Sequence, residues 1–146
     1  MTTGHPGAVL LDTCAAIWLA NGDPLAANAL TAVMDAGRRG GIFVSPISAW
    51  EIGMLSRPKL GRDSGIRFLP DPKSWFARFT AGPGIRIAAF DSDIAIAASW
   101  LPGEMHGDPG DRLIVATARH LGLPIITRDR RIIGYGETGE VSVIVC

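Results

Sequence analysis

The sequence predicts an α/β domain with a mainly parallel sheet, because short apolar runs alternate with longer segments that carry helical end signals. Aspartate–proline pairs precede three of the longer segments and place a capping carboxylate before each first helical residue. The chain has 146 residues, 47% of them hydrophobic, and can therefore bury a substantial core. We expect a single domain over residues 1–146.

Five short apolar segments are expected to be the strands of the sheet. Each is too short for a core helix and is consistent with a buried strand of a parallel sheet. We expect these strands at residues 8–11, 42–45, 85–90, 124–127 and 141–145.

The segments between the strands are expected to be helices. We expect them at residues 13–20, 24–39, 46–56, 72–80, 92–101 and 109–120, with a short helix or turn at 128–135. Capping alone accounts for four aspartates, which are Asp23, Asp71, Asp91 and Asp108.

Composition excludes several classes of protein. The 14 basic and 14 acidic residues cancel, which argues against coating of nucleic acid or acidic membranes by bulk positive charge. Two cysteines, Cys14 and Cys146, are too few for a disulfide scaffold, and no Cys/His spacing typical of zinc is present. With no signal-peptide pattern and no apolar run of about 18 to 20 residues, a cytoplasmic protein without membrane association is expected.

Two acids follow expected strands. Asp12 comes directly after the first strand, and Asp129 lies two residues beyond the strand at 124–127. Ligand sites of α/β sheets lie beyond the carboxyl ends of the strands, so both carboxylates are candidates for chemistry. The alternatives are a helix cap for Asp12 and a turn or cap residue for Asp129.

Two further acids lie on helices among apolar neighbours. Glu51 has Ile47 and Leu55 one turn away, so it lies either at the edge of its helix or beside a partner. Asp111 shares a helix face with Ile114, which turns it toward the core at an electropositive helix N-terminus. The alternatives are a surface glutamate and a capping box formed with the Asp108 cap.

Four carboxylates at one edge of a sheet would repel one another and have raised pKa values. Hard divalent cations remove that repulsion, and such ions can activate a water for in-line phosphoryl displacement. The residues therefore indicate metal-assisted hydrolysis of a phosphate ester. Other classes lack their motifs, since the chain has no phosphate-binding P-loop, no Rossmann glycine pattern and no second aspartate two residues after Asp12. A phosphoacceptor of the receiver type would also need paired acids after the first strand and a late lysine, and both are missing.

Four segments resemble the motifs of PIN-domain ribonucleases. They are LLDTCAAIWL (10–19), VSPISAWEI (44–52), HGDPGDRLIVATA (106–118) and LPIITRD (123–129). Each motif is short, but their order and combination are specific, and the resemblance extends from Val9 to about Val145. The pattern is most similar to VapC-type toxins of toxin–antitoxin pairs.

The resemblance implies a three-layer α/β/α sandwich with a five-stranded parallel sheet. It implies an endoribonuclease that depends on Mg²⁺ or Mn²⁺ and hydrolyses phosphodiester bonds of tRNA, rRNA or mRNA. It also implies a homodimer and a VapB-type antitoxin that covers the active site with a C-terminal segment. The alternative is a PIN-like interaction module without catalysis, against which the presence of all four acids argues.

The family's catalytic and metal-binding acids match Asp12, Glu51, Asp111 and Asp129. Secondary site candidates are Thr13, Asp108, which is a cap first, and Thr127, which matches a hydroxyl residue beside the last acid.

Arginines near these acids are candidates for contacts with RNA phosphates, because a guanidinium pairs with two phosphate oxygens at once. The candidates are Arg112, Arg128, Arg130 and Arg131, with Arg57, Lys59, Arg62 and Arg67 in the loop after the Glu51 helix. Solvated surface charge is the alternative for each, and Arg112 could instead pair with Asp108. Of the four tryptophans, Trp75 is the one expected to be exposed.

Overall fold

A single parallel sheet forms the centre of the part of the chain that the structure, a computed structural model, describes, which is residues 5–58 and 65–146. Its strand order is β3-β2-β1-β4-β5, and all four pairings are parallel. The strands are β1 (Val9–Leu11), β2 (Ile42–Val44), β3 (Ile85–Ile87), β4 (Ile125–Thr127) and β5 (Val143–Val145). The predicted five-stranded parallel sheet is therefore confirmed.

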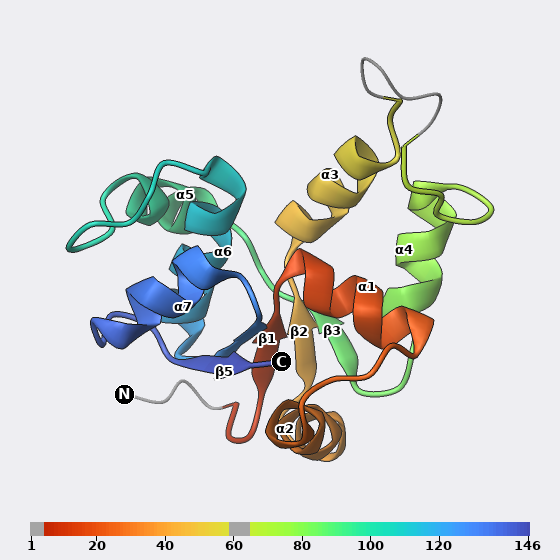
Figure 1. Cartoon of the computed structure of the whole chain (residues 1–146), viewed down its shortest axis with the longest axis horizontal. Coiled ribbons are helices and arrows are strands. Elements are labelled where there is room, and N and C mark those ends of the chain that lie inside the picture. The colour runs from red at the N-terminus through yellow and green to blue at the C-terminus, as the bar shows by residue number, and fades with distance from the viewer. Residues whose placement is uncertain (1–4, 59–64) are drawn as a thin grey trace.

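Helices cover both faces of this sheet. They are α1 (Thr13–Asn21), α2 (Ala27–Arg38), α3 (Pro46–Leu55), α4 (Pro72–Thr80), α5 (Ser92–Ser99), α6 (Pro109–Leu121) and α7 (Arg130–Glu137). Figure 1 shows α5, α6 and α7 on one side of β1, and α1 and α4 on the other. Among the described residues, no helix is long and apolar enough to cross a bilayer.

The core lies in two layers because side chains alternate between the faces of a strand. Leu10 of β1 belongs to the cluster that contains Ile114 of α6 and Ile132 of α7. Its neighbour Leu11 belongs to the other cluster, with Val33 of α2. The predicted three-layer α/β/α sandwich is thus confirmed, with one apolar core on each face of the sheet.

Three of the four predicted aspartate caps are confirmed by hydrogen bonds from backbone N–H groups. Asp71 Oδ1 accepts from Ser74 at 2.8 Å, Asp91 from Ile94 at 3.0 Å and Asp108 from Asp111 at 3.0 Å. Each carboxylate satisfies an N–H group that lacks a partner within the first turn of its helix.

The fourth predicted cap, Asp23, is wrong. Its N–H donates to Trp18 O at 2.9 Å, so Asp23 closes the end of α1 and does not open α2. Helix α2 begins at Ala27, and no side chain caps it. The aspartate–proline pair here lies in the connection between the two helices.

All five strands are shorter than predicted, three of them by one residue, and β3 and β5 by more because their partners end. β3 stops at Ile87, since its neighbour β2 stops at Val44 and Ser45 already caps α3 by accepting from the Ile47 N–H at 3.0 Å. β5 begins at Val143, which pairs with the first residue of β4. As a result, β1, β2 and β4 all pass into helices within three residues of their carboxyl ends.

Candidate active site

A cavity of about 430 Å³ lies beyond the carboxyl ends of β1, β2 and β4. We call it the acidic cavity; the acidic residues in its lining are Glu51, Asp108, Asp111 and Asp129, and Thr13 and Cys14 also face it. Strand ends, the middle of α3 and the first turn of α6 therefore bring together residues that are far apart in the sequence.

Asp12 lies beneath this cavity and is only 7% exposed. Its Oδ1 caps α1 by accepting from the Ala15 N–H at 2.8 Å, and its Oδ2 accepts from the Thr127 hydroxyl of β4. Burial raises the pKa of Asp12, and the bonds from Thr127 and Ala15 offset that only in part. The capping alternative is therefore correct for Asp12, but it occupies only one carboxylate oxygen.

Glu51 is half-buried and bonds to a hydroxyl rather than to a cation. Its Oε1 accepts from the Thr13 hydroxyl, which also lies 2.9 Å from Ser48 Oγ. Its Oε2 packs on Gly110, where a Cβ would be only 2.5 Å away, so no residue larger than glycine fits without moving the carboxylate. Burial raises the pKa of Glu51, and nearby Asp108 adds to the effect.

The ionisation of Asp111 is hindered by burial and by the neighbouring acids. Burial, followed by the charges of Asp108, Asp129 and Glu51, raises its pKa to about 7. Its Oδ2 is buried and accepts no hydrogen bond within the described residues. The Arg131 guanidinium lies 3.7 Å from this oxygen, too far for a hydrogen bond.

Asp129 caps α7 and also faces the acidic cavity. Its Oδ1 accepts from the N–H groups of Arg131 at 2.8 Å and Ile132 at 3.2 Å. Its Oδ2 lies 3.7 Å from the Arg131 guanidinium, and its own N–H donates to Thr127 Oγ1 at 2.9 Å. The capping alternative is therefore also correct for Asp129, and it leaves Oδ2 on the cavity side.

The four acids act together on one neighbour, Cys14. Burial, followed by the charges of Asp12, Glu51, Asp129 and Asp111, raises the pKa of this thiol to about 11. Their charges therefore converge around Cys14. Over the described ranges, however, no three acidic, histidine or cysteine side chains are close enough together to hold an ion as they stand.

The arginines differ from one another in what they contact. Arg130 and Arg131 are exposed beside the acidic cavity, and Arg128 stacks on Trp18 at 3.7 Å while donating to Cys146 O at 3.1 Å. Arg57 and Arg67 are exposed, whereas Lys59 and Arg62 lie outside the described residues.

Arg112 does not support the predicted contact with RNA. Its Nε donates to Ala98 O at 3.0 Å and its Nη1 to Met105 O at 2.9 Å, so the guanidinium holds the loop before α6. The alternative pairing with the Asp108 carboxylate is not formed either. The guanidinium instead donates to the carbonyl oxygens of Ala98 and Met105, and no spacing along the sequence indicates these contacts.

Two residues at the site were missed by sequence reasoning. His106 approaches Asp111, with Nε2 3.4 Å from Oδ2. The only indication of this role in the sequence was the position of His106, two residues before the Asp108 cap. Trp50 lines the acidic cavity and is 51% exposed. Trp75, by contrast, was wrongly expected to be exposed, because it is half-buried and stacks on Phe79.

Known proteins resemble this chain along almost its whole length. The PIN domain family model matches residues 9–137. Ribonuclease VapC22 of Mycobacterium tuberculosis is 30% identical over 136 residues, which cover 92% of this chain and 97% of that protein.

Solved structures with low sequence identity have the same fold. A structure of VapBC2 from Rickettsia felis, bound to a DNA fragment from its promoter, contains a chain with a TM-score of 0.65 and 16% identity, covering 94% of this chain and 98% of that one. FitAcB from Neisseria gonorrhoeae has a TM-score of 0.55 and 20% identity, over 93% of this chain and 96% of that one. The chain therefore belongs to the PIN domain family and is a relative of the VapC ribonucleases.

Proposed function

We propose that this protein is a metal-dependent endoribonuclease and the toxin of a type II toxin–antitoxin pair. The observation that carries the proposal is the convergence of four carboxylates around Cys14 at the carboxyl ends of the strands. The ribonuclease named among its relatives supports the same activity.

The donor set fits a hard divalent cation, Mg²⁺ or Mn²⁺. Asp12, Glu51, Asp111 and Asp129 offer only carboxylate oxygens, the ligands these ions prefer. Asp111 lies among the charges of Asp108, Asp129 and Glu51 and is partly buried, so its ionised form is costly unless a cation compensates it. When bound, such an ion would activate a water and stabilise the charge that develops on the phosphodiester.

The threonines position two of these acids. The Thr127 hydroxyl fixes one oxygen of Asp12, and the Thr13 hydroxyl fixes one oxygen of Glu51. Each carboxylate is thereby oriented without a second charge. Glu51 keeps Oε2 for coordination, whereas Asp12, whose Oδ1 also caps α1, would coordinate through the remaining lone pairs of its two oxygens. Asp108 also contributes negative charge from the cavity wall while it caps α6.

Arg131 is the proposed main contact with the RNA phosphate. It is exposed and lies 3.7 Å from both Asp111 and Asp129, beyond hydrogen-bond reach of either. Once a cation compensates those acids, the guanidinium can turn to a phosphate and donate to two oxygens. Arg130, which is exposed, and the free edge of Arg128 would extend this basic surface.

Partners follow from the relatives by analogy. Similar chains occur in VapBC and FitAcB assemblies, so we propose a VapB-type antitoxin as the cognate partner. We also propose a homodimer, and tRNA, rRNA or mRNA as the substrate.

Cleavage assays on defined RNAs test the proposal. The purified chain should cut at least one RNA in a pool of tRNA, rRNA and mRNA fragments with Mg²⁺ or Mn²⁺, and a chelator should stop the reaction. Asp12→Asn and Asp111→Asn should each lose more than about 100-fold in rate, because each removes a charged ligand. Asp93→Asn, at an exposed position of α5, serves as the matched control.

The outcomes separate the alternatives. If both site variants cut like the wild type, the assignment of the acids is wrong. If the wild type cuts none of these RNAs but binds the product of a neighbouring short gene, the chain acts as a catalytically silent interaction module.

A further inference from the structure

His106 and Asp111 face each other through two buried atoms. His106 Nε2 and Asp111 Oδ2 lie 3.4 Å apart, and within the described part of the chain neither atom has a hydrogen-bond partner. Buried polar atoms without partners are rare in native proteins, because each loses its hydration without compensation. Two such atoms facing each other require an explanation.

The other ring nitrogen identifies the proton position of His106. Asp108 N–H donates to His106 Nδ1 at 3.1 Å, so Nδ1 is an acceptor and carries no proton. The ring proton is therefore on Nε2, which faces the Asp111 carboxylate. A ring in this state cannot take a proton at Nε2, so His106 is not placed to act as the general base of the reaction.

The loop that carries His106 is fixed independently of the acids. Arg112 Nε donates to Ala98 O at 3.0 Å, and its Nη1 donates to Met105 O at 2.9 Å and lies 3.4 Å from His106 O. The same first turn of α6 holds Asp111, whose N–H donates to Asp108 Oδ1 at 3.0 Å. Ring and carboxylate are thus both anchored to one short piece of backbone.

We propose that His106 is a positioning residue that holds Asp111 Oδ2 through its Nε2–H. The two atoms are 3.4 Å apart here, and we expect this distance to shorten on assembly of the site, as hydrogen bonds at active sites commonly do. One oxygen of Asp111 is then held by the protein, and the other is directed to the cation. The proposal rests on the proposed function in that Asp111 is taken to be a metal ligand.

The tautomer is tested in the metal-free wild type. Long-range proton–nitrogen spectra of the histidine rings, recorded at pH 8 with chelator, should show the His106 proton on Nε2 and a bare Nδ1. A proton on Nδ1 overturns the proposal, whatever the activity of the protein.

The positioning role is tested by Mn²⁺ affinity, measured by electron paramagnetic resonance without RNA. His106→Met removes the donor and should weaken Mn²⁺ binding by about 10- to 100-fold. His106→Gln carries an N–H at nearly the same reach and should recover most of the affinity. His120→Met, at an exposed position near the other end of α6, is the matched control and should bind like the wild type.

Asp111→Asn distinguishes failure of this inference from failure of the proposed function. If His106→Met folds and binds Mn²⁺ as tightly as the wild type while Asp111→Asn does not, His106 has no positioning role and the metal site stands. If Asp111→Asn also binds as tightly, the metal assignment itself is wrong and the positioning role falls with it. Circular dichroism of each variant reports whether the fold is intact.

Discussion

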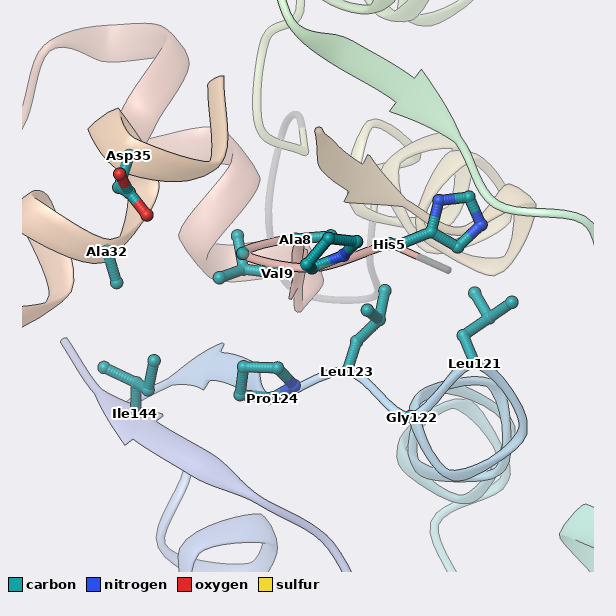
Figure 2. A pocket seen from close by; sticks show the side chains of 12 residues that line it. His5, Ala8, Val9, Ala32, Asp35, Leu121, Gly122, Leu123, Pro124 and Ile144 are labelled. Atoms are coloured by element: carbon teal, nitrogen blue, oxygen red, sulfur yellow. The ribbon is translucent and has the colours of Figure 1, made fainter. Parts of the chain in front are cut away.

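Two hollows lie at opposite ends of the sheet, and they differ in how their polar groups are satisfied. The acidic cavity lies beyond the carboxyl ends of the strands, whereas the second hollow, of about 310 Å³, lies at the amino ends of β1 and β4. Figure 2 shows apolar side chains on the walls of this second hollow, which we call the apolar hollow. They include Val9, Leu123, Pro124 and Ile144.

The titratable groups of the apolar hollow have partners. His5 packs edge-on against Phe43, with ring centroids 5.1 Å apart, and Asp35 pairs with Arg39 at 3.1 Å. In the acidic cavity, by contrast, Asp111 Oδ2 has no hydrogen-bond partner among the described residues. Two hollows of similar size thus differ in charge. Glu51, Asp108, Asp111 and Asp129 line the acidic cavity, whereas Asp35 of the apolar hollow pairs with Arg39, so the acidic cavity is the better candidate for binding a cation.

The largest expected effect is a pH dependence of stability that arises in the acidic cavity alone. The pKa of Asp111 is about 7 in the folded chain and near 4 when unfolded, so between these values the folded state holds a proton that the unfolded state lacks. The metal-free protein therefore loses stability as pH rises from about 4 to about 7. Asp111→Asn cannot ionise and should become more stable than the wild type by about 4 kcal/mol at pH 8.

Urea unfolding with chelator at pH 5, 6, 7 and 8 measures this difference. The gap between wild type and Asp111→Asn should widen with pH and stop widening above about pH 7.5. A constant gap over this range would mean that Asp111 ionises normally and that its charge is already compensated.

The next effect tests the close approach of α3 to α6. Gly110→Ala places a Cβ 2.5 Å from Glu51 Oε2 and 3.0 Å from its Cδ, so the carboxylate must move away from Thr13. The fold should survive, because only the end of a flexible side chain is displaced. Mn²⁺ affinity should fall by about 10- to 100-fold, as measured by calorimetry.

Gly53→Ala is the matched control on α3, since its Cβ would meet nothing within 4 Å. This variant should keep the Mn²⁺ affinity and gain about 0.5 kcal/mol of stability, because alanine limits the unfolded chain more than glycine does. Equal affinities in both variants would show that Glu51 needs no fixed position.

The strands, and the position of two acids beyond their carboxyl ends, were predictable because both depend on local patterns. Asp12 and Asp129 follow apolar strands, and the carboxyl ends of parallel strands meet at one edge of a sheet. The resemblance to a family added Glu51 and Asp111, whose own neighbours left surface or capping alternatives open.

Contacts between distant segments were not predictable. The fit of Glu51 against Gly110 depends on how closely α3 and α6 approach, and no spacing along the chain encodes that approach. The contacts of Arg112 were not predictable for the same reason, because the carbonyl groups that accept from it belong to α5 and the loop before α6. The prediction for Asp23 failed for a different reason, since an aspartate–proline pair is compatible with both a helix start and a connection between helices.

A smaller effect on RNA cleavage is expected from removing the Thr127 hydroxyl, which donates to Asp12. Thr127→Val keeps the shape of a fully buried side chain but leaves Asp12 Oδ2 and the Asp129 N–H without their partner. The bond from Thr127 lowers the pKa of Asp12, so its loss should raise that pKa further and weaken RNA cleavage by about tenfold at neutral pH. Stability should fall by about 1 kcal/mol.

Thr117→Val is the matched control, because Thr117 is equally buried but donates to Leu113 O inside α6 at 2.8 Å. It should change stability without changing cleavage. Part of the lost activity of Thr127→Val should return as the pH is raised, because a raised pKa leaves more of Asp12 to be ionised at higher pH. A pH-independent defect would instead indicate that Thr127 acts by shape alone.

The smallest effect is expected at the apolar hollow. Asp35→Asn removes the charge of the one carboxylate there, which pairs with Arg39 four residues further along α2. Both side chains of this pair are more than a third exposed, and exposed pairs of this spacing contribute less than about 0.5 kcal/mol. Stability should therefore change by no more than this amount, and RNA cleavage should be unchanged. A loss of cleavage in Asp35→Asn would mean that the two ends of the sheet are coupled, because no described ion pair joins Asp35 to the acidic cavity.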